Sequence, residues 1–169
     1  NLFELGRCTF SELKQHRGMG EAKALTVLAA MELGRRRQLC NAEKRKQIRS
    51  SSDAYKVMSP LLADLKHEEF WVILLNRSNR IIGKEQVSTG GIASTVVDAK
   101  MVYQRSVIEL ATSIVLCHNH PSGNLRPSKA DIDLTQKLVR GGAALDITIL
   151  DHLIISELGY YSFADEGML

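Results

Sequence analysis

Hydrophobic and polar positions along the chain predict a fold in which strands and helices alternate. Continuous apolar runs, or alternating runs bounded by turn residues, predict a strand in each of five segments: 70–75, 80–88, 114–118, 147–155 and 160–163. The polar residues 76–79 predict the turn between the first two strands. Strands of this length, separated by helical segments, predict an α/β fold with a sheet of mixed direction.

The remaining patterned segments have helical periodicity. They are a short segment at 10–14, a longer one at 21–37, a segment at 53–65 broken around Ser59-Pro60, a segment from Asp98 to Glu109, and a segment from Ser128 to Arg140. Asp98 and Ser128 are expected N-caps, and Gly141-Gly142 is expected to end the last helix. We therefore expect helices packed on the sheet, preceded by a small helical N-terminal region.

Charge and composition divide the chain into three parts. We expect a helical region at 1–40, a basic, serine-containing linker at 41–52 and a catalytic domain at 53–169. Residues 1–50 contain 11 Lys or Arg and 5 Asp or Glu, a net charge of +6, whereas the remainder has a net charge of −3. This asymmetry predicts a nucleic-acid-facing appendage on a neutral to acidic catalytic body.

A glycine-containing turn lies between the two predicted N-terminal helices. Gly18 and Gly20 permit a tight turn, and the free N–H groups of the following helix can face a phosphate. The segment resembles the hairpin of a helix-hairpin-helix motif, so Arg17, Gly18, Gly20 and Lys23 are candidate contacts to the DNA backbone. The alternative is a helical hairpin that only reverses the chain. The basic runs at 35–37 and 44–46 are better explained as a solvated helix end and linker.

Several protein classes are excluded or disfavoured by composition. No apolar run approaches the roughly 18 residues needed to cross a bilayer. The first residues lack the basic and apolar regions of a secretory leader. Cys8, Cys40 and Cys117 form no metal-binding pair, and their odd number fits reduced thiols. We expect a cytoplasmic protein without membrane association; the sequence does not indicate an oligomeric state.

One segment of the chain predicts a metal site. His118 and His120 are two residues apart at the end of an apolar run, so on a strand they face the same side. A loop containing Pro121, Gly123 and Pro127 can then bring Asp131 back to them. Two imidazoles and a carboxylate are a common ligand set for a catalytic zinc, which retains an open position for water. The predicted chemistry is hydrolysis with one zinc ion per chain.

The same residues also have a simpler interpretation. A histidine pair alone is a weak indication of a metal, and Ser128 followed by Asp131 fits the first turn of a helix. The two interpretations are compatible, because a cap that defines where the helix begins also defines where Asp131 points. Cys117 precedes the first ligand, and strand alternation turns it away from the site into the core.

The string from His118 to Asp131 resembles the JAMM motif of MPN+ metalloproteases. His118-Asn119-His120-Pro121-Ser122-Gly123, Pro127-Ser128 and Leu150-Asp151-His152 are more specifically similar to the bacterial RadC family. The resemblance covers essentially the whole chain and implies an MPN fold of cytidine-deaminase-like architecture. It also implies zinc ligands at His118, His120 and Asp131, a glutamate as general base, and a Ser128 that steadies the oxyanion.

The general base and the role of His152 remain open at this level. The family places its glutamate just before the first strand of the domain, where Glu68 and Glu69 adjoin. The RadC pattern selects Glu68, and because strand neighbours point in opposite directions Glu69 is then expected to be solvated. Glu85 is a distant third candidate. His152 either orients a ligand through a hydrogen bond or is an ordinary core histidine.

Three functions are consistent with these features. The favoured one is a zinc-dependent JAMM-type hydrolase acting on a peptide or isopeptide amide, with an unknown protein or peptide substrate. The family's association with DNA repair and the basic N-terminal region suggest a second, a nuclease-like or other DNA-processing enzyme using the same metal. The third is a non-catalytic MPN scaffold, which is disfavoured because such scaffolds usually lack the ligands.

Overall fold

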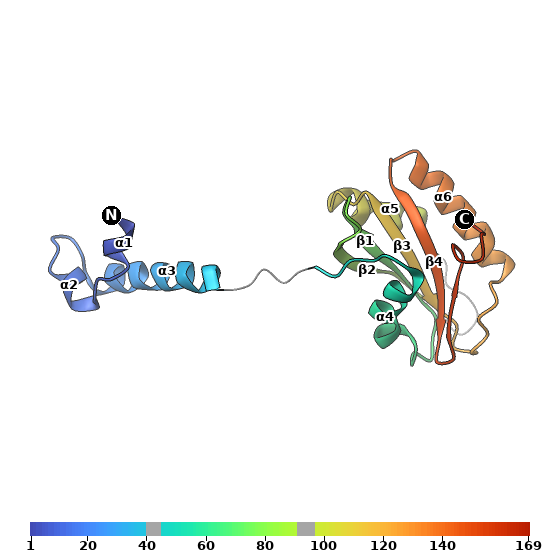
Figure 1. Ribbon diagram of the computed structural model, residues 1–169, viewed down its shortest axis with the longest axis horizontal. Coiled ribbons are helices and arrows are strands. Elements are labelled where there is room, and N and C mark those ends of the chain that lie inside the picture. The colour runs from blue at the N-terminus through green and yellow to red at the C-terminus, as the bar shows by residue number, and fades with distance from the viewer. Residues whose placement is uncertain (40–44, 91–96) are drawn as a thin grey trace. The chain divides into compact units, whose positions relative to one another are not determined.

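The computed structural model describes residues 1–39, 45–90 and 97–169 (Figure 1). By their internal contacts these residues divide into two compact units, Asn1–Lys44 and Arg45–Leu169. Within the described residues, no helix is both long and apolar enough to cross a membrane.

The first unit is a small helical arrangement of α1 (Leu2–Leu5), α2 (Phe10–Lys14) and α3 (Glu21–Leu39). Capping boxes begin both short helices, because Asn1 and Thr9 each accept a hydrogen bond from the backbone three residues later. Ala24 of α3 is buried, but Leu25 is 58% and Leu33 67% exposed. The apolar side chains of α3 are therefore covered only in part within the described residues.

The second unit is built on one five-stranded mixed sheet. Its strands are β1 (Glu69–Leu75), β2 (Ile81–Thr89), β3 (Ser113–Asn119), β4 (Thr148–Ser156) and β5 (Gly159–Ser162). The spatial order is β2-β1-β3-β4-β5, and only the pair β3 and β4 is parallel. All five predicted strands are present, and the mixed α/β class is confirmed. The adjacent inner strands β3 and β4 carry His118 and His152.

Helices cover both faces of this sheet and create two cores. Helix α4 (Ser51–Leu62) packs Met58 and Leu62 against residues such as Cys117 and Leu153 on one face. Helices α5 (Ala99–Ile108) and α6 (Lys129–Ala143) cover the other face, where the core contains these residues among others: Val102, Tyr103, Leu116, Leu138 and Phe70. As predicted, Cys117 points away from the histidine that follows it. The long α6 is visible beside the sheet in Figure 1.

Two predicted helix interruptions are wrong. Helix α4 runs continuously through Pro60, which is exposed near its end and removes only one backbone hydrogen bond. Helix α6 continues past Gly141-Gly142 to Ala143. A Cβ at Gly142 would lie 2.4 Å from the carbonyl oxygen of Ile147, so this glycine permits close packing rather than helix termination.

The expected linker also differs from the structure. Residues 41–44 lie outside the described residues, as does Cys40. Residues 45–52 do not form a free linker, because the Ile48 N–H donates to the Asn79 carbonyl at 2.9 Å and the Ile81 N–H donates to the Lys46 carbonyl at 2.9 Å. The Ile48 side chain is 5% exposed and belongs to the core, and Ser50 caps α4. Structure therefore resumes before residue 53.

Candidate metal centre

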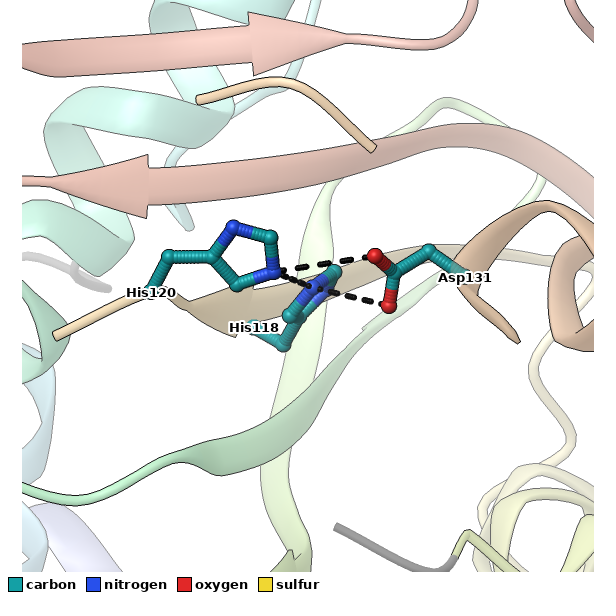
Figure 2. A group of neighbouring side chains, drawn as sticks. All are labelled: His118, His120 and Asp131. Carbon is teal, nitrogen blue, oxygen red and sulfur yellow. Dashed lines mark hydrogen bonds and ion pairs between the residues drawn. The ribbon is translucent and has the colours of Figure 1, made fainter. Parts of the chain in front are cut away.

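Three predicted ligands converge at the end of β3 (Figure 2). The Nε2 atoms of His118 and His120 are 3.0 Å apart. Asp131 places Oδ1 3.2 Å from His118 Nε2 and Oδ2 3.6 Å from His120 Nε2. Zinc bonds of about 2.05 Å in a tetrahedral site imply ligand separations of about 3.3 Å. The three separations therefore fit a single metal ion of this size.

The free nitrogen of each imidazole already has a partner. His120 lies just beyond β3, where its N–H donates to the Ile155 carbonyl at 2.9 Å and its Nδ1 donates to the Asn124 carbonyl at 2.6 Å. His118 Nδ1 lies 2.8 Å from Nε2 of His152. Both rings thus turn Nε2 toward the carboxylate, the arrangement expected of histidine ligands held by a hydrogen bond on the opposite nitrogen.

The helix start positions Asp131. The Asp131 N–H donates to Ser128 Oγ at 3.2 Å, and the Ser128 N–H donates to Asp131 Oδ2 at 2.7 Å, which completes a capping box. One carboxylate therefore both begins α6 and faces the two histidines. Burial raises the pKa of Asp131, but the neighbouring imidazoles of His118 and His120 outweigh burial and hold that pKa far below its usual range.

The same carboxylate acts on His120. The Asp131 carboxylate, whose Oδ2 lies 3.6 Å from His120 Nε2, raises the pKa of His120 above the usual value, against a smaller opposing effect of burial. The carboxylate therefore stabilises a positive charge at His120 Nε2. A metal cation can supply that charge in place of the proton, and it competes with the proton for the same Nε2 lone pair.

The two neighbouring glutamates have different surroundings. Glu68 lines a cavity of about 500 Å³ together with the three candidate ligands and Ser128. The carboxylate of Glu69 instead accepts a hydrogen bond from Trp71 Nε1 at 2.7 Å and lies 2.9 Å from His67 Nε2. Glu69 is 9% exposed, so the expectation that it is solvated was wrong. The predicted opposite orientation of the two side chains is observed.

Asn119, between the two histidines, was not identified from the sequence. Its Oδ1 accepts a hydrogen bond from the Glu69 N–H at 2.8 Å, and its Nδ2 donates to the His67 carbonyl at 2.9 Å. The carbonyl of Glu68 itself accepts from the Gly90 N–H at 2.8 Å. The strand that carries the ligands therefore holds the backbone on both sides of Glu68, a contact that no spacing rule would reveal.

His152 contacts the candidate ligand His118 but does not face the space between the three candidate ligands. Its ring is fully buried and contacts Thr135 Oγ1 at 2.6 Å with the nitrogen opposite His118. Burial lowers the pKa of His152, and the neighbouring His118 lowers it further. Of the two open roles, the hydrogen bond to a ligand is the one that the structure contains. Thr135 was not singled out from the sequence, because it has no motif of its own.

The remaining candidates lie elsewhere. Glu85 on β2 pairs with Arg105 of α5 at 2.9 Å and does not line the cavity. Gly18, in the hairpin of the first unit, has a φ of +84°, and its carbonyl accepts a hydrogen bond from Lys23 Nζ at 3.1 Å. Arg17 and Gly20 are exposed beside it. Arg17, Gly18 and Gly20 lie between α2 and α3, and Lys23 lies in the first turn of α3. The helix-hairpin-helix assignment and DNA contact there stay predictions.

Comparison with known proteins gives a consistent match. The family model of the RadC-like JAB domain matches residues 48–168. A UPF0758 protein of Flavobacterium johnsoniae is 51% identical over 168 residues, covering 99% of this chain and 73% of that protein. A UPF0758 protein of Porphyromonas gingivalis is 47% identical, covering 100% and 75%, and one of Methanococcoides burtonii is 37% identical, covering 100% and 74%. The matched region contains all three candidate ligands.

Proposed function

The chain belongs to the RadC family of JAB-domain proteins, and from this membership and its site we propose that it is a zinc-dependent hydrolase of the JAMM type. The bond that it cleaves is an amide, in a peptide or an isopeptide. One observation carries the proposal: two imidazoles and a carboxylate converge with metal-ligand spacing in a cavity that a further carboxylate, Glu68, also lines. A metal site beside a carboxylate can hydrolyse an unactivated carbonyl, because the metal activates the water and the carboxylate accepts its proton.

Each residue has a defined part in the proposed reaction. Zinc held by His118, His120 and Asp131 would supply a water of lowered pKa and polarise the carbonyl of the substrate. Glu68 accepts the proton that this water loses and returns it to the leaving amine. Ser128 lines the same cavity, and its hydroxyl donates to the carbonyl oxygen as negative charge develops there. Ser128 keeps its capping bond meanwhile, because there its Oγ is the acceptor.

Cleavage by the zinc-loaded protein tests the proposal. A library of peptides and of lysine-linked isopeptides is incubated with the wild type and with Glu68→Gln, which keeps the size of the side chain and removes its basicity. We expect cleavage by the wild type to fall by about 100-fold or more in the variant, with zinc content unchanged. No cleavage of either class by fully loaded wild type, or equal cleavage by the variant, would contradict the proposal.

The nuclease reading is the second candidate. It is supported by the net charge of +6 over residues 1–50. One metal with two histidines and one aspartate is a smaller site than the two-metal centres common in nucleases. Cleavage of DNA that depends on Glu68 would favour this reading over the amide hydrolase. A scaffold without activity would bind zinc and cleave neither substrate.

We also propose that the hairpin of the first unit binds DNA by contacting the phosphates of the DNA backbone. Arg17 and Lys23 are exposed beside the turn at Gly18. In fluorescence anisotropy with a mixed-sequence duplex, Arg17→Ala/Lys23→Ala should weaken binding and lower the salt dependence by about two phosphate contacts. Lys137→Ala/Arg140→Ala in the second unit removes the same charge and should leave both unchanged. Equal effects of the two double variants would contradict this placement.

A further inference from the structure

The two candidate histidine ligands are held by different kinds of partner. His120 Nδ1 faces the carbonyl oxygen of Asn124, which can only accept a hydrogen bond. His118 Nδ1 faces another imidazole nitrogen, Nε2 of His152, at 2.8 Å. A neutral imidazole carries its proton on either nitrogen, so this partner can donate or accept. Whether His152 Nε2 donates or accepts depends on the partner of its other ring nitrogen, Nδ1.

The partner of His152 Nδ1 is the hydroxyl group of Thr135. Its hydroxyl donates to the backbone carbonyl of Asp131 at 2.6 Å, one helical turn earlier. The hydroxyl has a single hydrogen, so toward His152 Nδ1, 2.6 Å away, its oxygen can only accept. His152 is fully buried, and the contacts of its ring nitrogens are Thr135 and His118. Its proton therefore lies on Nδ1, and its Nε2 is left with a lone pair.

We propose that Thr135 and His152 are positioning residues that set the tautomer of His118 and thereby present its Nε2 lone pair to the metal. Because His152 Nε2 accepts, His118 Nδ1 must carry the proton, and His118 Nε2 carries none. The relay runs from the Asp131 carbonyl through Thr135 and His152 to His118. The relay therefore begins and ends at candidate ligands. Through it, the position of Asp131 at the start of α6 determines which ring nitrogen of His118 is free to bind the metal.

The opposite arrangement would block the site. If His152 carried its proton on Nε2, it would donate to His118 Nδ1, and the proton of a neutral His118 would move to Nε2. That N–H would point at Asp131 Oδ1, 3.2 Å away, where it makes a hydrogen bond instead of offering a lone pair to a cation. The proposal deepens the proposed function, because it concerns the same zinc ligands. It can be tested without any substrate.

The two decisive variants differ in whether the side chain at position 135 keeps its hydroxyl group. Thr135→Val removes the acceptor for His152 and keeps the shape of the side chain, whereas Thr135→Ser retains the hydroxyl. Ser106→Ala is the matched control, because Ser106 is also fully buried on a helix and its hydroxyl donates to the carbonyl four residues earlier, at 2.8 Å. Ser106 lies on α5 and does not line the cavity.

Two measurements read the relay. Zinc affinity, by competition with a chromophoric chelator at fixed pH, should fall 10- to 100-fold in Thr135→Val and stay within about 3-fold of the wild type in Thr135→Ser and Ser106→Ala. Long-range ¹H–¹⁵N correlation spectra of zinc-free protein show which ring nitrogen of each histidine carries hydrogen. We expect Nδ1–H on both His118 and His152 in the wild type.

The outcomes separate the relay from the function that it serves. Equal zinc affinity of the valine and serine variants, or an Nε2–H on neutral His118 in the zinc-free wild type, would overturn the relay. A wild type that binds no zinc would sink the proposed function, and the tautomer spectrum would still decide the relay. If Thr135→Val does not fold, the wild-type spectrum remains sufficient to overturn or support the assignment.

Discussion

Asp131 has two roles, and their coincidence explains why this short segment has so strong a sequence signature. Its carboxylate completes the capping box with Ser128 and also faces both histidines. A carboxylate that only capped a helix could be replaced by several residue types at a cost of about 1 kcal/mol. One that also holds a cation cannot. The cap is present, and the geometry also fits the interpretation of Asp131 as a metal ligand.

Zinc-free protein should lose stability as the pH rises. The pKa of His120 is raised by Asp131, so the protonated imidazole stabilises the fold at low pH, and this contribution is lost as the pH rises through that raised pKa. Between pH 6 and 9 we expect the free energy of unfolding, measured in urea with a chelator, to fall by an amount on the order of 1 kcal/mol. His120→Gln should remove this part of the pH dependence.

Zinc binding should have the opposite pH dependence to the stability of the zinc-free protein. Zinc binds the neutral form of His120, so zinc affinity should increase over the same pH range in which zinc-free protein becomes less stable. Asp131 contributes in the opposite direction at acid pH: its depressed pKa means that its stabilisation is lost as the pH falls below about 4. An identical pH dependence of unfolding in the wild type and His120→Gln would contradict the pairing of His120 with Asp131.

The two adjacent glutamates should separate stability from chemistry. Glu69→Ala leaves the partly buried Trp71 indole N–H without its acceptor, so we expect a loss of about 1 kcal/mol in the free energy of unfolding. Zinc content should not change. Glu68→Gln should have the smaller effect on unfolding and the larger effect on hydrolysis. Loss of hydrolysis in a folded, zinc-loaded Glu69→Ala would mean that the base assignment is reversed.

Sequence and structure agree closely on the ligands and less closely on what holds them. His118, His120 and Asp131 are linked by short spacings, so a strand, a loop and a cap suffice to predict their convergence. Thr135 and His152 are 17 residues apart and meet because α6 packs on β4. Asn119 and the backbone around Glu68 meet through the pairing of β1 with β3. Contacts of this kind depend on tertiary packing, which no local pattern encodes.

At the level of elements, the site is a junction of β3, β4 and α6. Strand β3 is buried along its whole length and supplies His118, parallel β4 supplies His152, and the first turns of α6 supply Asp131 and Thr135. Each element is also anchored in the core by side chains that do not line the cavity: Leu116 on β3, Leu153 on β4 and Leu138 on α6. Ligands on strands and helices are placed more precisely than ligands on loops, which favours a preorganised metal centre.

Gly141 and Gly142 show why element boundaries were harder to predict than elements. A glycine pair after an amphipathic segment is a common helix end, and the pattern alone predicted one. Here α6 continues because Tyr103 and the Ile147 carbonyl pack directly against these glycines. The same composition therefore serves close packing of the helix against its neighbours, and only the packed structure distinguishes the two uses.

This packing predicts a large effect of one methyl group. Gly142→Ala would place a Cβ 2.4 Å from the Ile147 carbonyl oxygen, so the backbone must shift, and we expect a destabilisation of about 1–3 kcal/mol. Gly34→Ala is the control: its Cβ meets nothing within 4 Å, and the change should be neutral or stabilise α3. Urea unfolding of both variants checks this. A stabilising Gly142→Ala would contradict the close approach.

At the scale of the whole molecule, the chain consists of a basic helical unit and a RadC-like JAB domain that begins earlier than its composition suggests. The serine run at 50–52 looks like a linker, yet Ser50 caps α4 and Ile48 is a core residue. Polar composition correctly indicates exposure but does not exclude a cap or a short β-bridge. The unit that carries the site therefore starts at about residue 45.

Truncation tests this boundary. A chain of residues 45–169 should unfold at nearly the same urea concentration as the full chain and bind zinc as tightly. A chain of residues 53–169 loses the buried Ile48 side chain and the Ser50 cap, which together contribute about 3 kcal/mol. Equal stability of the two fragments would show that residues 45–52 are the linker that the sequence predicted.

The zinc content of the purified protein after metal removal and reconstitution, measured by elemental analysis, tests the metal centre most directly. We expect about one zinc per chain in the wild type and in His16→Ala, which removes an exposed histidine of the first unit. We expect that zinc to be lost in His118→Ala/His120→Ala. Wild-type protein that stays free of zinc after reconstitution, or a double variant that retains it, would contradict the metal centre on which the proposed hydrolase depends.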